Sequence, residues 1–492
     1  MAGCRLIYSI MCVLVLVAML ASPCGAGADL AEVPDTLWPA LRGTAEGRAT
    51  CQWPASMSPP NVREWHFQSK SRRRYRPGLA VWASPAIALV GGRPMAFLGG
   101  YDQALHALDL VDKERKWFKI TNGAIGAAPA VGQVNGRTVV FWGSADRTVY
   151  AHFALNGTRL WTRELVKPTN TMGEAEVSSP LLHDSKLYIT CFVYDRALAR
   201  NDQKGWLFAL DMASGRVVWQ LEATQGPLSS PVGREMDGRF VVFVAARRGL
   251  LQAFDVSGEQ PTRLWSYQMP HEVLGSPAVE EGTERPLLFL GSKFGNLVAL
   301  DARTGEERWK RMAGNWIDNS ACIGMLEGER VVFVGSHDYN VYAFRAADGA
   351  LLWRRHLGGE VYSAPAFFFK GEPMLAVAAL DNRVYVLNAK SGKVVTSYYT
   401  GRPIWDKVAK GETLWGSPAI LAAGEQTAIV HGSFNDWVYV LPVTGECTLR
   451  AQVQSAAGLW YGLGIVLVLF LGIVMPILLI LSRRNTDPAP TA

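Results

Sequence analysis

Short apolar segments separated by glycine and polar residues recur along most of this chain. In the clearest copy, the pair Ala278-Val279 follows a proline, residues 287–292 form a second segment, and residues 297–301 form a third. A fourth segment, residues 307–310, carries a tryptophan. Apolar and polar residues alternate in these segments, and Gly, Asn and Asp stand between them, as β-hairpins require. Each copy therefore predicts four short antiparallel strands.

The copies return at a steady interval, marked by a Ser-Pro or Ala-Pro pair ahead of the first strand. Successive marks are 44 to 53 residues apart, which is the length of four short strands and their turns. Eight marks predict an all-β fold, an eight-bladed β-propeller of four-stranded blades, because a closed ring leaves only short strand edges exposed. A solenoid of the same units is the alternative. The marks are Pro85, Pro129, Pro180, Pro231, Pro277, Ala321 in place of a proline, Pro365 and Pro418.

The two ends of the repeat predict how the ring closes. No tryptophan follows the last turn at Gly445, whereas residues 63–67 have the form of an isolated fourth strand. We expect that strand to complete blade eight. Cys51 precedes it and Cys447 follows the last turn. In an oxidising compartment a Cys51–Cys447 disulfide would lock the closure.

The other cysteines and the motif content argue against several kinds of site. Cys191 and Cys322 fall in different blades, and we expect both to be buried and free. No Cys-x-x-Cys and no adjacent cysteine pair follows the first 28 residues, which argues against structural zinc, attached c-type haem and thioredoxin-like chemistry. Hydrolase and nucleotide-binding motifs are missing as well. We therefore predict no catalytic residue and no metal site.

The most regular part of the unit is Asp-x-x-x-Gly-x-x-x-Trp, which occurs at residues 301–309 and again at 211–219. We interpret it as structural. Asp301 caps a turn, Gly305 closes that turn with a positive φ, and Trp309 pins the outer strand.

Apolar segments at both ends predict membrane targeting. Residues 1–28 have the form of a signal peptide, with Arg5 before an apolar core and a small-x-small cleavage site at the end. A membrane helix is the alternative there, although the apolar run is short for one. Residues 456–481 carry no charge, are long enough to cross a bilayer, and precede Arg483 and Arg484, which predicts a cytoplasmic C-terminus.

The predicted organisation follows from these segments. Cys24 invites a lipoprotein interpretation, but Pro23 before it fits such a site poorly. The predicted parts are a signal peptide (1–28), an N-terminal extension (29–61), the propeller (62–447), a linker (448–455), a transmembrane helix (456–481) and a short cytoplasmic tail (482–492).

The order Ser-Pro-Ala-Val, Gly-Ser, Ala-Leu-Asp and Thr-Gly…Trp resembles the pyrroloquinoline-quinone-like propeller repeat, best in residues 276–309 and 179–219. That family includes quinoprotein alcohol dehydrogenases and non-enzymatic eight-bladed proteins such as the BamB-like outer-membrane assembly lipoproteins. The resemblance covers residues 62–446 and looks closer in style to the BamB-like members. The vicinal disulfide, the haem motif and the recognisable calcium-ligand set of the enzymatic branch are missing here.

In such a fold, the residues just before each Ser-Pro are expected to line the mouth of the central channel. Carboxylates converging there could hold a cation or a basic ligand, and tryptophans could pack a flat ligand or a partner's side chain. The alternatives are that the carboxylates solvate a wet tunnel and that the aromatics fill space between blades. The candidates are Glu176, Asp318, Glu360, Trp316, Trp405 and Trp415.

Three stretches exceed what the repeat needs, namely residues 163–176, 194–205 and 400–414, and long loops are where partners usually bind. The basic run 70–76 could meet an acidic partner, although a solvated connection is the plainer interpretation. Asn156 heads an Asn-x-Thr glycosylation sequon in a turn.

These observations predict a membrane-anchored propeller on the extracellular, periplasmic or lumenal side, which binds a protein partner and has neither catalysis nor a cofactor of its own. The net charge of +6 over 492 residues gives no reason to expect nucleic acid. The alternative, from the resemblance alone, is a quinone- and calcium-dependent dehydrogenase that passes electrons to the membrane.

Overall fold

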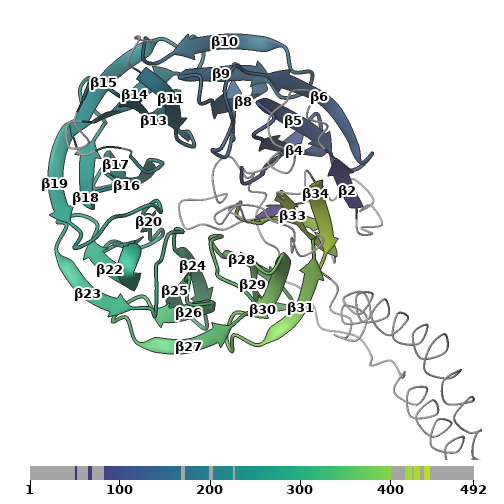
Figure 1. The fold of residues 1–492 in the computed structure, drawn as a ribbon, viewed down its shortest axis with the longest axis vertical. Coiled ribbons are helices and arrows are strands. Elements are labelled where there is room, and N and C mark those ends of the chain that lie inside the picture. Colours follow the sequence, from purple (N-terminus) through teal and green to yellow (C-terminus); the bar gives the residue numbers. More distant parts are fainter. Residues whose placement is uncertain are drawn as a thin grey trace, which may run out of the picture. The chain divides into compact units, whose positions relative to one another are not determined.

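Eight β-sheets stand around a ring, as Figure 1 shows. The computed structural model describes residues 50–52, 65–68, 83–167, 172–198, 203–224, 226, 228–400, 416–423, 426–432 and 437–443. All of them belong to the structural unit Thr36–Ala492. The predicted all-β, eight-bladed propeller of four-stranded blades is confirmed.

The first four blades follow one another in chain order. Blade one contains β3 (Ala86–Val90), β4 (Arg93–Gly99), β5 (Ala104–Asp109) and β6 (Glu114–Ile120). Blade two contains β7 (Ala130–Val134), β8 (Arg137–Gly143), β9 (Thr148–Phe153) and β10 (Arg159–Glu164). Blade three contains β11 (Met172–Val177), β12 (Leu181–His183), β13 (Lys186–Asp195), β14 (Lys204–Asp211) and β15 (Val217–Thr224). Blade four contains β16 (Val232–Met236), β17 (Arg239–Ala245), β18 (Leu250–Asp255) and β19 (Thr262–Gln268).

The other four blades complete the ring. Blade five contains β20 (Ala278–Val279), β21 (Leu287–Gly291), the 3-10 turn η1 (Lys293–Gly295), β22 (Asn296–Asp301) and β23 (Glu307–Met312). Blade six contains β24 (Cys322–Leu326), β25 (Glu329–Gly335), β26 (Asn340–Arg345) and β27 (Leu351–His356). Blade seven contains β28 (Ala366–Lys370), β29 (Glu372–Ala379), β30 (Arg383–Asn388) and β31 (Val394–Tyr399). Blade eight contains β32 (Ala419–Ala423), β33 (Gln426–Gly432) and β34 (Trp437–Pro442), joined by β1 (Thr50–Gln52) and β2 (Trp65–Gln68).

Each blade runs from the centre of the ring to its rim. In Figure 1 the fourth strands, such as β19, β23 and β27, form the rim, and the first strands, such as β16, β20 and β24, point to the centre. Middle strands are buried along most of their length, whereas rim strands are largely exposed, as in β23, where Trp309 is the one buried residue. This difference matches the apolar middle segments and the polar fourth segments of the sequence.

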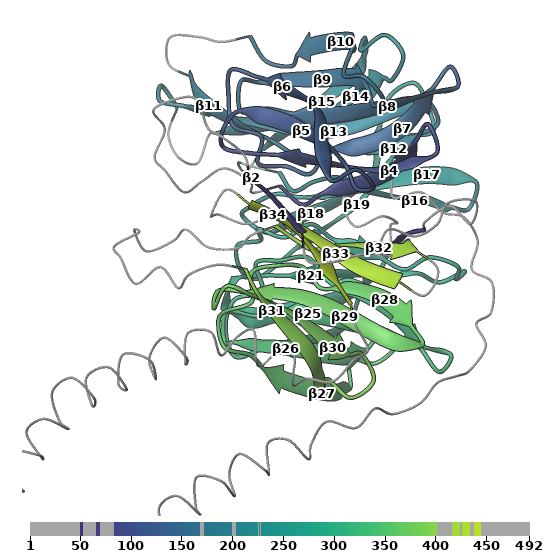
Figure 2. The same cartoon turned by 90° about the vertical axis from the view of Figure 1, so that its right-hand side faces the viewer.

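The N-terminal segment closes the ring on blade eight. The predicted orphan strand is β2, which pairs antiparallel with β34 in the register Trp65 opposite Val440 (Figure 2). The structure adds a feature that the sequence did not predict, because β1 lies parallel to β32 with Cys51 opposite Leu421. Strands from residues 50–68 therefore cover both edges of the blade formed by the C-terminal strands.

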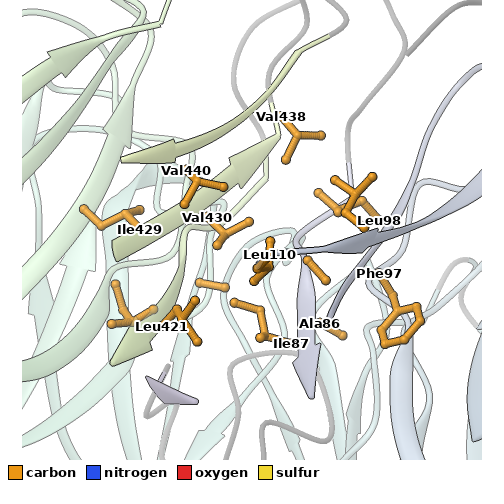
Figure 3. Close-up of a cluster of buried hydrophobic side chains, with 14 of the residues drawn as sticks. Ala86, Ile87, Phe97, Leu98, Leu110, Leu421, Ile429, Val430, Val438 and Val440 are labelled. Atoms are coloured by element: carbon orange, nitrogen blue, oxygen red, sulfur yellow. The ribbon is translucent and has the colours of Figure 1, made fainter. Parts of the chain in front are cut away.

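Apolar side chains seal the junction between the last blade and the first. Figure 3 shows Ile87 of blade one close to Val430 of blade eight, and Leu98 and Val440 belong to the same cluster. These side chains are almost fully buried and belong to one continuous core cluster. The apolar surface they remove from water stabilises a contact between segments more than 300 residues apart in the sequence.

The Asp-Gly-Trp motif shapes a turn within its own blade and also contacts the neighbouring blades. Asp301 caps its turn as predicted, since its carboxylate accepts a hydrogen bond of 2.9 Å from the amide of Arg303. Gly305 has a φ of +76°, and a side chain there would lie 2.7 Å from Trp265 of the preceding blade. Trp265 in turn donates to the carbonyl oxygen of Ala302 at 3.0 Å. The tryptophan therefore pins its strand to the next blade rather than to its own turn.

Blade three departs from the predicted loop pattern. Residues 163–176 were expected to form a long connection, but residues 172–176 belong to β11, which pairs with the far half of β13. The interpretation of that part as loop is wrong. Pro180 interrupts the edge, and β12 resumes pairing with the near half of β13.

Several predictions concern residues outside the described part of the chain. They are the signal peptide (1–28), the basic run 70–76, most of the loop 400–414, Cys447, and all segments from 448 to 492. No helix in the described ranges has the length and apolar character needed to cross a membrane.

Candidate binding site at the turns of blades four to seven

Two kinds of loop meet at one end of blades four to seven. The first is the turn between the second and third strands, and the second is the connection that leads from one blade to the next. The amide of His337, in the β25–β26 turn, donates to the carbonyl oxygen of Trp316 at 3.0 Å. The amide of Val361, in the connection to blade seven, donates to the carbonyl oxygen of Ser336 at 3.1 Å. These bonds hold turn and connection together.

In blades five and six, a β-branched anchor residue of the connection to the next blade packs against the glycine that ends the second strand. A methyl group added to Gly335 would lie 2.3 Å from a methyl carbon of Val361, and one added to Gly291 would lie 2.3 Å from Ile317. The Gly-Ser pairs of the sequence therefore provide space for these anchors. Because an anchor side chain points into the blade, its two neighbours in the chain are free to point elsewhere.

The neighbours of the anchors gather around His337. We call Lys293, Trp316, Asp318, His337, Glu360 and Tyr362 the His337 cluster. The imidazole Nε2 lies 3.3 Å from Oδ2 of Asp318, and Nδ1 lies 3.9 Å from Oε2 of Glu360. The ring centroid of Tyr362 is 3.8 Å from that of His337, and the ring centroid of Trp316 is 5.5 Å from it. Two carboxylates and two aromatic rings therefore surround one imidazole.

His337 is neutral at pH 7, because burial lowers its pKa to about 4. Its approach to Asp318 meets the distance of an ion pair, but Nε2 makes no hydrogen bond there, and the neutral ring brings no charge. We therefore regard the contact as a packing contact. Oδ1 of Asp318 is likewise buried without a hydrogen-bond partner among the described residues.

The surroundings of Asp318 disfavour the ionised form of its carboxyl group. Burial is the main cause that raises its pKa to about 6, and the negative charges of Glu272 and Glu360 act in the same direction. The positive charges of Lys293 and Arg247 act against this shift. A carboxylate whose pKa is raised by its surroundings, in a cluster of polar side chains, is a common mark of a functional site.

The two cations that act on Asp318 also act on other carboxylates. Lys293 lies 3.0 Å from Glu272 and 4.7 Å from the ring centroid of Trp316. Arg247 lowers the pKa of Glu176, which burial raises. Glu176 is exposed to solvent, yet enough protein atoms lie around its carboxyl group to raise its pKa. Both observations are expected for a side chain that faces the central channel.

The structure thus brings three of the predicted site residues together. Asp318, Glu360 and Trp316 meet around His337, and Glu176 is linked to this region through Arg247. Trp405 and Trp415 lie outside the described residues. Sequence reasoning missed Arg247, Lys293, His337 and Tyr362. Arg247, Lys293 and His337 could have been found from their position, because each lies two residues after the second strand of its blade. Lys293 and His337 also directly follow a Gly-Ser pair.

Two other predictions lie elsewhere on the fold. Cys191 and Cys322 are buried and neither is in a disulfide bond, as predicted. The backbone of Cys51 is in β1, but Cys447 is outside the described residues, so the disulfide stays a prediction. Asn156 lies exposed in the β9–β10 turn, where its side chain accepts a hydrogen bond of 3.0 Å from the amide of Thr158.

One group in the described part of the chain has the spacing of metal ligands. His183, Asp184 and Glu235 offer atoms within 4.8 Å of one another. The carboxylates are largely exposed, and the group lies at the other end of blades three and four, near the β12–β13 turn. It is therefore separate from the His337 cluster.

Comparison with known proteins identifies the family of this chain. Residues 203–309, 262–398 and 293–459 each match the family described as outer membrane protein assembly factor BamB. Together these segments span residues 203–459, just over half of the chain. The chain belongs to this family.

The relatives within the family are distant. The BamB protein of Nitrosomonas eutropha is 25% identical over 245 residues, covering 49% of this chain and 54% of the relative. The BamB protein of Shewanella oneidensis is 27% identical over 270 residues, covering 52% and 60%. The matches span little more than half of these relatives' own length.

The fold is also shared with enzymes. A quinohemoprotein alcohol dehydrogenase from Comamonas testosteroni superposes with a TM-score of 0.61, covering 84% of this chain and 81% of the enzyme at 12% identity. At that identity the likeness concerns the fold alone. The sequence has no adjacent cysteine pair, and the one group with metal-ligand spacing in the described ranges lies away from the inner turns.

Proposed function

We propose that this protein is a membrane-anchored, extracytoplasmic propeller that binds a protein partner through the turns of blades four to seven and performs no catalysis. Membership of a family described as an assembly factor supports a binding role. The observation that carries the proposal is the His337 cluster, where buried polar atoms of Asp318 and His337 are left without hydrogen-bond partners. Such atoms are costly in a folded protein unless something binds them.

The proposed anchor is the helix of residues 456–481, with a cytoplasmic tail after it. Its support is the uncharged run and the two arginines that follow it. Protease treatment of sealed vesicles whose interior corresponds to the cytoplasm tests this arrangement. The protease should digest the propeller on the outside and leave a tag at the C-terminus intact inside.

The partner is tested by capture from the protein's own membrane. The full-length chain is crosslinked in place, solubilised and purified, and bound proteins are identified by mass spectrometry. A specific protein lost when Glu360 is replaced by Gln supports the proposal. Capture of no specific protein contradicts the binding role, whereas equal capture by wild type and variant contradicts only the recognition of the partner by the His337 cluster.

The enzymatic alternative has a direct test of its own. The full-length chain is incubated with pyrroloquinoline quinone and calcium, and dye reduction by alcohols or sugars is measured. We expect no saturable quinone binding and no reduction. Turnover that depends on the quinone would replace the scaffold proposal by a dehydrogenase.

A further inference from the structure

Charge balance at the inner turns points to a missing cation. Among the described residues, the negative charges of Glu272 and Glu360 raise the pKa of Asp318, whereas the positive charges of Lys293 and Arg247 lower it. Lys293 is already paired with Glu272, and Arg247 also lowers the pKa of Glu176. In the described part of the chain, no lysine or arginine forms an ion pair with Asp318 or Glu360, and the imidazole that lies near both is neutral.

The surroundings of these two carboxylates are aromatic. Tyr362 lies against one part of the imidazole and Trp316 against another, with interplanar angles of 31° and 39°. Trp316 is 37% exposed and the side chain of Glu360 is 33% exposed, whereas the side chain of Asp318 is only 10% exposed. A ligand approaching from solvent would meet Trp316 and Glu360 first.

A bare metal ion fits this arrangement poorly. Asp318 lies beside Nε2 of His337 and Glu360 lies beside Nδ1, on different sides of the ring. One ion cannot contact both carboxylates together with one ring nitrogen at usual bond lengths. A planar organic cation, in contrast, can stack on aromatic rings and donate hydrogen bonds in several directions in its plane.

From these observations we propose that the His337 cluster binds an arginine side chain presented by the partner protein. The guanidinium group packs on the exposed face of Trp316 and donates hydrogen bonds to the carboxylates of Glu360 and Asp318. Arginine is favoured over lysine because its donors form a planar fork that matches carboxylates, and because it is less strongly hydrated than an ammonium group. This inference rests on the proposed function, since it names the group by which the partner is recognised.

The first test uses a defined probe and the full-length protein. The peptide acetyl-Gly-Gly-Arg-Gly-Gly-amide is compared with its citrulline analogue, which has nearly the same shape but no charge. Binding is followed by saturation-transfer NMR. We expect the arginine peptide to bind about 10-fold or more tightly than the citrulline peptide, because hydrogen bonds to charged groups are the stronger ones. Equal binding of the two peptides overturns the inference.

Variants separate this site from general surface charge. Glu360→Gln and Asp318→Asn should each weaken binding of the arginine peptide about 10-fold. The matched control is Glu329→Gln, since Glu329 is an exposed carboxylate at the opposite end of β25, 3.2 Å from Arg345. It removes one charge from the same blade and should leave binding unchanged. An equal effect of all three variants overturns the inference.

Failure of this inference can be told from failure of the proposed function. If the partner captured from the membrane binds wild type and both cluster variants equally, the arginine site is wrong and the partner binds elsewhere. If the arginine peptide binds as expected but no partner is captured, the site stands and the scaffold role fails. Unfolding curves of the variants exclude misfolding as the cause of lost binding.

Discussion

The indole nitrogen of Trp309 donates a hydrogen bond of 2.8 Å to the carbonyl oxygen of Ala346 in the next blade. The same ring covers Gly349, where an added methyl group would lie 2.7 Å from it. Equivalent bonds join Trp117 to Ala154 and Trp353 to Ala389. The ring is therefore held by a repeated contact between neighbouring blades, made on the rim and away from the His337 cluster.

The exception among these tryptophans provides a test. Trp219 is buried like Trp309, but its indole nitrogen has no hydrogen-bond partner among the described residues. Trp309→Phe should lower the free energy of unfolding by about 1–2 kcal/mol more than Trp219→Phe, because only the first leaves a carbonyl oxygen without its donor. Urea unfolding of both variants measures the difference. Equal losses would show that the hydrogen bond adds nothing to ring packing.

A second prediction concerns the anchor under the binding site. Gly335→Ala should destabilise the protein and weaken arginine-peptide binding, because the new methyl group would displace Val361 and with it Glu360 and Tyr362. Adding Val361→Ala should restore part of the stability by removing the clashing methyl group. Thermal unfolding and peptide titration check both effects.

The control for the anchor is Gly126→Ala in the connection to blade two. No atom lies within 4 Å of a methyl group added at Gly126, and its backbone is not in the left-handed region. This substitution should leave stability and binding nearly unchanged. A large loss for Gly126→Ala would mean that glycine is needed for backbone reasons rather than for space.

Acid should destabilise the protein through its buried histidines. His431 is fully buried, and burial lowers its pKa to about 4. Because the folded pKa lies below the unfolded value of about 6.5, the unfolded state binds the proton first, and stability falls as the pH drops from about 6.5 to 4. The slope should approach about 1.4 kcal/mol per pH unit for each such histidine.

His431→Leu tests this contribution. The two ring nitrogens of His431 have no hydrogen-bond partner in the described part of the chain, so an apolar side chain removes both the titration and the unpaired atoms. The variant should lose less stability between pH 6.5 and pH 4 than wild type in urea unfolding. His152 and His337, whose pKa values are also lowered to about 4, should maintain part of the slope. An unchanged slope would exclude His431 as its source.

The pH dependence of stability that Asp318 contributes should be opposite to that of the buried histidines. Its folded pKa of about 6 lies above the usual 3.8, so its ionisation disfavours the folded state as the pH rises from about 4 to 6 and above. Asp318→Asn should therefore raise the free energy of unfolding at pH 7 by about 1–3 kcal/mol and change it little at pH 3. Unfolding at both pH values checks this. Lower stability of the variant at pH 7 would show that the carboxylate is already satisfied.

The ring closure gives a further prediction. If Cys51 and Cys447 form a disulfide, neither thiol should react with an alkylating reagent under denaturing, non-reducing conditions, whereas Cys191 and Cys322 should both react. Mass spectrometry of the digested protein locates the label. Labelling of Cys51 and Cys447 to the same extent as Cys191 and Cys322 would contradict the bond.

Much of the fold was predictable because the repeat is local. The turn at Asp301 to Gly305 and the apolar strands depend on neighbouring residues, so their pattern is visible in the chain. The partner of Trp309 was not predictable, because Ala346 lies 37 residues away in the next unit. The strand β1 was missed for a similar reason, since its partner β32 is about 370 residues away.

The sequence alone determined the number of blades, the strand that closes the ring and the position of most inner loops, because each follows from a period or a turn signal within about 50 residues. It also singled out Asp318, Glu360 and Trp316. Only the tertiary structure decided that His337 lies near both carboxylates, that the imidazole is neutral, and that no described lysine or arginine forms an ion pair with Asp318 or Glu360. Those facts depend on burial and on distances between loops of different blades, which no local pattern records.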